Sequence, residues 1–354
     1  MKRRTPDYYH RFECIGSACR DNCCVGWEID IDDEAYGDYC SVQGAFGQRL
    51  MEYIDHRRPY HFIMEGDRCP FLNTRNLCDI YMKLGKDRLC QICTDHPRFY
   101  ETYGDRLEAG LGLVCEEAAQ LILNNKDKLL FIDEGEGQEE AEDPWLQMLN
   151  QVRDQVILLL QERKRPLWER LALVLSQAMI LQEDYSRQDK KSMSAHIHRQ
   201  WTVERPHEDP ADVKEWFLDC IEFLQSLELL TDQWEKILDL AYDKVREEKI
   251  VFSDPDPIFY EQLMIYFVYR YFLRSVYDFQ LLDKIRFAIF SCLAVRVLET
   301  AVSDQEQIPP KEIARLYSKE IEYSEENMEA LNEEFLFSQM FEKQKLLNAV
   351  SIVF

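Results

Sequence analysis

Ten of the twelve cysteines lie between Cys14 and Cys115, and several of their spacings are typical of metal ligands. A density near one in ten marks either a disulfide scaffold or a metal site. The candidate ligands are Cys14, Cys19, Cys23 and Cys24 in a first group and Cys69, Cys78, Cys90, Cys93 and Cys115 in a second group. Thiolates in such groups bind zinc or iron–sulfur clusters. The choice between disulfides and metal depends on the cellular compartment.

The chain begins with basic residues, but no apolar stretch follows them, so we expect no secretory signal. The most apolar stretches, near 263–273 and 287–295, are broken or bounded by arginines and are shorter than the roughly 18–20 uncharged residues of a membrane span. We therefore expect a cytoplasmic protein whose thiols bind metal rather than form disulfides. Cys40, Cys220 and Cys292 have no close cysteine neighbour and are predicted to be buried, inert thiols.

The spacings within the groups indicate which thiols are able to bind the same metal. Cys19 and Cys23 are four residues apart, so on a helix they would share a face and reach one metal. Cys90 and Cys93 form a C-x-x-C pair, which binds zinc or a cluster. Nine candidate ligands exceed the need of one zinc ion or one cluster, so two sites, or one site with further structural or resolving cysteines, both fit the pattern.

His96 and Arg98 follow the C-x-x-C pair at once. Arg98 is able to hold a carboxylate through two parallel hydrogen bonds, and His96 is able to act as a ligand or a base. The alternative is that both side chains satisfy local backbone groups beside a metal loop. The sequence contains no dinucleotide-binding glycine fingerprint, P-loop or G-x-S-x-G elbow, so a small-molecule cofactor must use another platform.

The composition changes along the chain and predicts a mainly α-helical fold in two parts. Residues 1–132 read as a loop-rich, cysteine-bearing metal-binding domain, in which metal binding substitutes for a large core. Residues 133–143 are acidic and glycine-bearing, which predicts a solvated linker. Residues 144–354 show apolar residues at helical spacing and predict an all-α bundle, with 260–297 at its centre.

Local signals place the ends of several helices. Asp-Pro pairs at 143–144, 209–210 and 256–257, and Ser324 before two glutamates, predict helix starts. Residues 116–131 are predicted to form one helix that leaves Cys115.

The net charge of −24 restricts the partners. Nucleic acids and anionic membrane surfaces require a basic protein surface, so neither is expected as a partner. A basic or lysine-bearing protein is compatible with the charge, which also simply keeps an acidic protein in solution.

The segment Phe12–Trp27, with its cysteines at 14, 19, 23 and 24, resembles the flagellin lysine-N-methylase family. The same likeness continues in Cys69-Pro-Phe-Leu72, in Leu77–Ile80 and in Leu89–Arg98. The cysteine core is also similar to a broader zinc- or iron-chelating C-x-x-x-C-x-x-C-C family. Here each gap is wider by one residue, which favours the methylase group.

This resemblance implies an enzyme that methylates lysine ε-amines of flagellin. It further implies S-adenosylmethionine as the methyl donor and a cysteine-bound iron–sulfur cluster, with zinc as the alternative metal. Two other functions fit the residues: a non-catalytic metal-binding module with a helical partner-binding domain, and a thiol redox sensor.

The cysteine pattern generates a first prediction. Protein purified without oxygen should contain iron and acid-labile sulfide and should show the visible absorption of a cluster. Metal and sulfide analysis with a spectrum checks this. Metal-free protein with intact disulfides, identified by mass spectrometry, would contradict any metal site.

Overall fold

The structure is a computed structural model that describes residues 1–135, 143–206, 210–303 and 308–354. It is mainly α-helical, as the sequence predicts. The helices of the first part are α1 (Asp33–Ser41), α2 (Gly44–Glu52), α3 (Asp79–Leu84), α4 (Gln91–Asp95) and α5 (Glu116–Leu123). The strands are β1 (Lys2–Pro6), β2 (Ile54–Asp55), β3 (His61–Phe62), β4 (Arg98–Tyr103), β5 (Arg106–Leu111) and β6 (Phe131–Glu134).

The chain after residue 143 is helical in all of its described elements. These are α6 (Pro144–Leu160), α7 (Leu167–Ser186), α8 (Lys190–Ile197), α9 (Pro210–Ser226), α10 (Asp232–Arg246), α11 (Pro257–Tyr271), the 3-10 turn η4 (Phe272–Arg274), α12 (Ser275–Asp278), α13 (Leu281–Val302), α14 (Pro310–Tyr317), the π-helical turn η5 (Ser318–Glu322), α15 (Glu325–Phe337), the 3-10 turn η6 (Gln339–Phe341) and α16 (Lys343–Val353). Most side chains of α11 and α13 are buried, which places these two helices at the centre.

The predicted helix starts are visible where the structure describes them. Asp143, Asp256 and Ser324 each precede a helix and accept a hydrogen bond from an amide of its first turn. Asp209 lies outside the described residues. The single helix predicted for 116–131 is wrong, because α5 ends at Leu123 and the chain then turns into β6.

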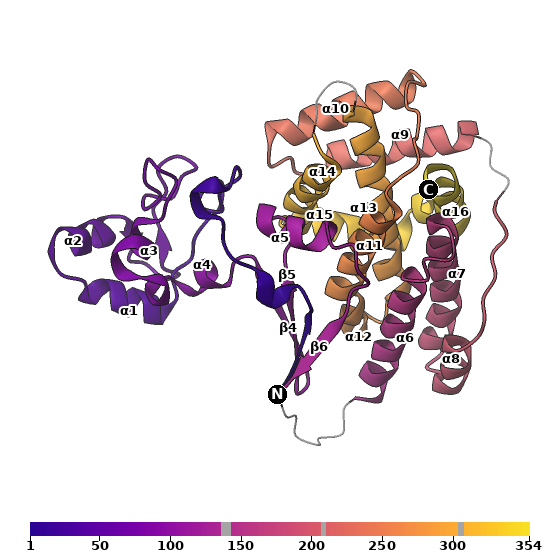
Figure 1. Cartoon of the computed structure of the whole chain (residues 1–354), viewed down its shortest axis with the longest axis horizontal. Helices are drawn as coiled ribbons and strands as arrows, with labels where there is room; N and C mark the ends of the chain where they lie inside the picture. Colours follow the sequence, from indigo (N-terminus) through magenta and orange to yellow (C-terminus); the bar gives the residue numbers. More distant parts are fainter. Residues whose placement is uncertain (136–142, 207–209, 304–307) are drawn as a thin grey trace.

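A four-stranded sheet, ordered β4-β5-β1-β6, joins the two ends of the first part of the chain. β1 pairs with β5 in parallel and with β6 in antiparallel orientation, and Arg3 lies opposite Leu107 and Glu134. Residues 133 and 134 of the predicted linker therefore end a strand, while 136–142 lie outside the described residues. Figure 1 shows this sheet between the small lobe that holds α1–α4 and the helical body.

Two separate hydrophobic cores divide the molecule. The smaller core holds buried residues from Ile29 to Cys90, around Tyr39, Phe71 and Phe62. The larger core extends over the helical body and also includes side chains of the sheet and of α5, such as Leu111. The sheet and α5, which the sequence assigns to the cysteine-rich part, thus pack with the helical bundle.

A buried ion pair fastens the sheet to this body. Glu108 on β5 accepts hydrogen bonds from both terminal nitrogens of Arg153 on α6, at 2.5 and 2.6 Å. The Arg153 side chain is 1 % exposed. Burial opposes the charge of Glu108, but the guanidinium of Arg153 holds the pKa of this carboxyl below its ordinary value.

No helix within the described ranges is long and apolar enough to cross a membrane. Of the three cysteines predicted to be buried, Cys220 and Cys292 lie in the larger core, whereas Cys40 is exposed on α1.

The ion pair generates a second prediction. Replacing Glu108 by Gln leaves the Arg153 charge buried without a counter-charge, so the free energy of unfolding should fall by about 3–5 kcal/mol. Urea unfolding followed by circular dichroism measures the change. Asp154→Asn is the matched control, because Asp154 lies on the same helix and pairs with Arg4 at the surface. This variant should change stability by less than about 1 kcal/mol, and equal effects of the two variants would contradict the prediction.

Candidate functional site

The thiols of the two cysteine groups gather in one region. Cys24 is within hydrogen-bonding range of the thiols of both Cys23 and Cys69. Cys90 forms a second such pair with Cys93. Cys23 is also close enough for its negative charge to raise the pKa of Cys93. Cysteines that lie more than forty residues apart in the sequence thus face one another.

Backbone geometry explains part of this gathering. The amide of Cys69 donates to the carbonyl of Cys24 at 2.8 Å, which places the two groups side by side. Cys78, Cys90 and Cys115 each occupy the residue directly before a helix, α3, α4 and α5. The free amides of the first turn lower the pKa of the thiols of Cys78 and Cys115, but burial outweighs them and raises both pKa values above the ordinary value.

Hydrogen bonds within the group set the charge of individual thiols. The bond from Cys24 lowers the pKa of Cys23 and of Cys69, and the same bonds raise the pKa of Cys24. The bond from Cys93 likewise lowers the pKa of Cys90. The arrangement therefore favours the thiolate, the form that binds metal, at Cys23, Cys69 and Cys90, and the neutral thiol at Cys24 and Cys93.

Cys14, Cys19 and Cys115 form a neighbouring set. Burial raises the pKa of Cys19 and of Cys115 to about 11, and the charge of Cys23 acts on both. The predicted helix across Cys19–Cys23 is wrong: Cys19 ends a short 3-10 turn and has extended backbone, with φ −71° and ψ 129°. The sulfur of Cys19 instead donates to the carbonyl of Asp21 at 3.2 Å.

Within the described residues, no group of three or more His, Cys, Asp or Glu side chains is placed to hold a single metal ion. A single ion with bonds of about 2.3 Å needs its sulfurs close together. A cluster spaces its thiolates more widely, because each binds a different iron. Thiols are the ligand type that both zinc and iron–sulfur clusters bind.

His96 directly follows α4, and Arg98 is the first residue of β4. Burial lowers the pKa of His96 to about 4, so its ring is neutral near pH 7. The Arg98 guanidinium lies over the rings of Phe12 and Tyr9, at 5.1 and 5.8 Å, and forms no ion pair within the described part of the chain. Their roles in binding a cofactor stay predictions.

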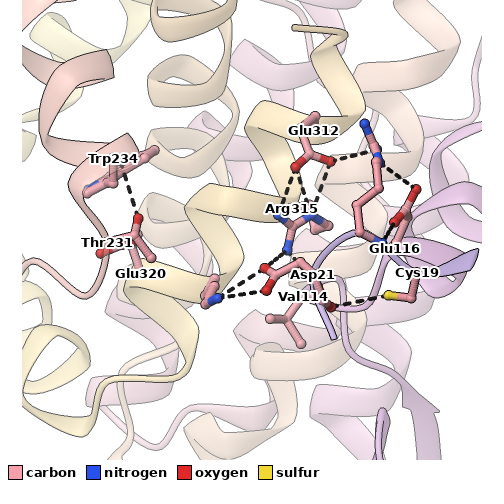
Figure 2. Close-up of polar contacts among 11 residues, drawn as sticks. Cys19, Asp21, Val114, Glu116, Thr231, Trp234, Glu312, Arg315 and Glu320 are labelled. Carbon is pink, nitrogen blue, oxygen red and sulfur yellow. Dashed lines mark hydrogen bonds and ion pairs between the residues drawn. The ribbon is translucent and has the colours of Figure 1, made fainter. Parts of the chain in front are cut away.

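The loop of residues 16–24, which carries Cys19, Cys23 and Cys24 and is called the cysteine loop below, contacts the helical body through Asp21. Its carboxylate accepts from Arg315 at 2.6 Å and from Lys319 at 3.0 and 3.1 Å (Figure 2). Burial opposes the charge of Asp21, but the two cations hold the pKa of its carboxyl below its ordinary value. Arg315 also binds Glu312, and its side chain is only 4 % exposed. These ion pairs therefore hold the cysteine loop against the surface that α14 and η5 form.

Directly behind this face lies a buried polar network. Glu322, the last residue of the π-helical turn η5, accepts hydrogen bonds from Tyr266 at 2.9 Å and from Tyr271 at 2.7 Å. Arg270 lies 3.1 Å from the same carboxylate. Single π-helical turns occur frequently at functional sites, because they displace one residue from the regular helical face.

Tyr323 connects the network to the cysteine region. Its ring meets Trp27 edge to face at 5.5 Å. Gly112, directly after β5, is required here, because a Cβ at this position would clash with the Tyr323 hydroxyl. Burial raises the pKa of Tyr323, which keeps the hydroxyl protonated near pH 7.

The cysteine loop meets the helical body at a contact called the junction below. A polar cavity of about 450 Å³ opens there. Its wall comes from the cysteine loop, from the start of α10 and from α14 with η5. Arg20, Asp21, Glu312, Arg315 and Lys319 supply its charges. The sequence pattern did not indicate these residues as part of a site. The i, i+4 spacing of Arg315 and Lys319 in an acidic chain is a weak signal for them, whereas the contact of Asp21, almost 300 residues earlier, has no local signal.

The model of the FliB lysine N-methylase C-terminal domain matches residues 153–349, which is more than half of the chain. The chain belongs to this family. No solved structure matches it.

Curated relatives match a shorter segment. Two proteins named lysine-N-methylase, from Salmonella typhimurium strain LT2 and Salmonella choleraesuis strain SC-B67, are each 31% identical over 132 residues. The match covers 35% of this chain and 33% of each relative, so the chain spans about a third of their length. The flagellar biosynthetic protein FliU of Salmonella muenchen is 30% identical over 132 residues, which is 78% of that protein.

The junction generates a third prediction. Asp21→Asn removes the charge that Arg315 and Lys319 share, so the free energy of unfolding should fall by about 1–3 kcal/mol. Hydrogen exchange should increase in residues 16–24, and urea unfolding measures the stability. Asp38→Asn is the control, since Asp38 forms an exposed pair with Arg88 in the same lobe. If both variants exchange and unfold alike, Asp21 does not fix the loop.

Proposed function

We propose that this protein methylates lysine ε-amines of a protein substrate, with flagellin as the first candidate. The observation that carries the proposal is the family match over 153–349, which includes the α14–η5 face that meets the cysteine loop. The relatives named lysine-N-methylase support lysine as the target, and the flagellar name of FliU supports a flagellar protein as the first candidate.

The reaction transfers a methyl group from S-adenosylmethionine. The lysine ammonium first loses a proton, because only the neutral amine has a free electron pair. That pair forms the new N–C bond while the C–S bond breaks, and its electrons neutralise the sulfonium. The methylated amine then carries the positive charge.

The thiols would hold an iron–sulfur cluster in this account. Cys23, Cys69, Cys90 and Cys93 would be the central donors, because hydrogen bonds or charge interactions link them across both groups. Four such thiolates would tie the two cysteine groups together through a cluster, whereas three would leave one iron open to a polar group of a substrate.

The chain's own residues supply the rest of the site. Asp21, Arg315 and Lys319 hold the cysteine loop against the helical body. The Trp27 and Tyr323 rings cover the contact between the two. A substrate lysine that becomes buried at this contact would lose its proton more readily, since removing an amine from water disfavours its charged form.

A fourth prediction tests the function in cells. Flagellin lysine methylation, read by mass spectrometry, should be present with the native chain and lost without it. Cys69→Ala and Cys90→Ala should reduce it at least about tenfold, because they remove central donors. Cys40→Ala should leave it unchanged, since Cys40 is an exposed cysteine of the same lobe.

Equal methylation with and without the chain would contradict the flagellin assignment. Methylation that depends on the chain but survives both cysteine substitutions would separate the activity from the thiols.

A further inference from the structure

One edge of the four-stranded sheet begins close to the thiols. The strand order is β4-β5-β1-β6, so β4 and β6 are the two edge strands. β4 starts at Arg98, five residues after Cys93, so the Cα atoms of these two residues are at most about 18 Å apart. In Figure 1, β4 lies along the side of the sheet nearest the small lobe. The edge of β4 is therefore next to the cysteine region.

The register of β4 shows which of its backbone groups point outward. The amide of Gly112 donates to the carbonyl of Pro97 at 2.6 Å, so these residues form a hydrogen-bonded pair at the start of the ladder. Opposite residues of an antiparallel pair alternate between hydrogen-bonded and non-hydrogen-bonded positions. The register therefore directs the amides and carbonyls of Arg98, Tyr100 and Thr102 away from β5.

One end of this outer edge is covered, and the other end is open within the described residues. The carbonyl of Thr102 accepts a hydrogen bond from the Tyr277 hydroxyl at 3.2 Å, and the Tyr277 ring stacks on Tyr103. The backbone groups of Arg98 and Tyr100 have no such partner in the described ranges. Unpaired backbone groups on an edge strand are a template for another extended segment. The open end is the end next to the thiols.

The side chains at the open end indicate the chemistry of a partner. The Phe99 ring meets Tyr269 of the helical body at 6.3 Å, so Arg98 and Tyr100 lie on the opposite face of the strand. Tyr100 is 40 % exposed. The guanidinium of Arg98 rests on aromatic rings and has no carboxylate partner in the described part of the chain. An acidic side chain on an added strand, opposite Arg98, would supply the counter-charge.

We propose that an extended, lysine-bearing segment of the substrate protein adds to the open end of β4 as a fifth strand, with an acidic side chain opposite Arg98. This inference rests on the proposed function, which supplies a protein substrate, and adds where and in which conformation that substrate is held. Backbone hydrogen bonds to Arg98 and Tyr100 give affinity for any extended segment, and the ion pair with Arg98 gives selectivity. A lysine farther along the same segment, beyond Arg98, then lies beside the cysteine region.

Hydrogen exchange tests the inference without reference to methyl transfer. Full-length protein, purified without oxygen, is mixed with purified monomeric flagellin in the absence of a methyl donor. The outward amides of Arg98 and Tyr100 should exchange at least about tenfold more slowly in the complex, because each gains a hydrogen bond. Amides of the other edge strand, β6, should exchange as they do without flagellin.

Proline substitution tests the backbone pairing directly. Tyr100→Pro removes an outward amide but no hydrogen bond to β5, and an edge strand tolerates proline at such a position. Flagellin binding, measured by biolayer interferometry, should weaken at least about tenfold. Tyr100→Ala removes the same ring but keeps the amide, so it should bind at least about five times more tightly than Tyr100→Pro.

Asp133→Pro on β6 is the matched control. The amide of Asp7 donates to the carbonyl of Leu130, and the register of β1 with β6 then directs the Asp133 amide outward on the opposite edge. This variant should bind flagellin like the native protein.

Arg98 variants test the charge of the partner. Arg98→Glu should weaken flagellin binding roughly ten- to hundredfold, because it places like charges opposite each other. Arg98→Lys keeps the charge and should restore most of the affinity. Circular dichroism checks that each variant is folded, and the exchange experiment on the native protein needs no variant.

Three results would overturn the inference. Flagellin that binds without slowing exchange in β4 would place the contact elsewhere, as would native affinity in both Tyr100→Pro and Arg98→Glu. Equal weakening by Tyr100→Pro and Tyr100→Ala would assign the contact to the ring rather than to strand pairing. The cellular methylation assay is independent of all three, so the proposed function stands if they occur. Flagellin that does not bind the native protein, and keeps its methylation in cells without the chain, would contradict both.

Discussion

The ion pairs between Asp21 and the Arg315–Lys319 face are the contact on which the arrangement of the site depends. The cysteine lobe and the helical body have separate hydrophobic cores, so apolar packing alone does not fix how the loop of Cys19 and Cys23 meets the body. A half-buried carboxylate bound to two nearly buried cations does so with a defined geometry. Such pairs give orientation more than stability, because desolvation offsets much of their attraction.

The same helical segment serves both sides of the junction. The π-helical turn η5 points Lys319 toward the cysteine loop and Glu322 toward the buried tyrosines of α11. The surface contact and the buried network are thus joined through a few residues of one turn. A regular α-helix would rotate one of these side chains away, since a π-helical turn inserts one residue into the repeat. The local irregularity is therefore what allows one short segment to meet both the thiols and the core.

The sequence predicted the features that depend on local chemistry. The helix starts at Asp143, Asp256 and Ser324 follow from side chains that cap neighbouring amides, and the mainly α fold follows from apolar periodicity. Prediction from the sequence failed where contacts between distant segments determine the structure. Residues 124–131 leave the helical pattern because β6 pairs with β1, more than a hundred residues earlier. The pairing of Asp21 with Arg315 also depends on two segments that lie far apart in the sequence, so no local pattern predicts it.

The central claim is that the junction between the thiols and the helical body supports lysine methylation, and a single-turnover experiment tests it most directly. Purified protein prepared without oxygen would be mixed with flagellin and a donor whose methyl group carries deuterium, and peptides would be read by mass spectrometry. The account predicts deuterated methyl groups on flagellin lysines, in the same amount as the S-adenosylhomocysteine formed. Folded protein that binds the donor but labels no lysine would contradict it.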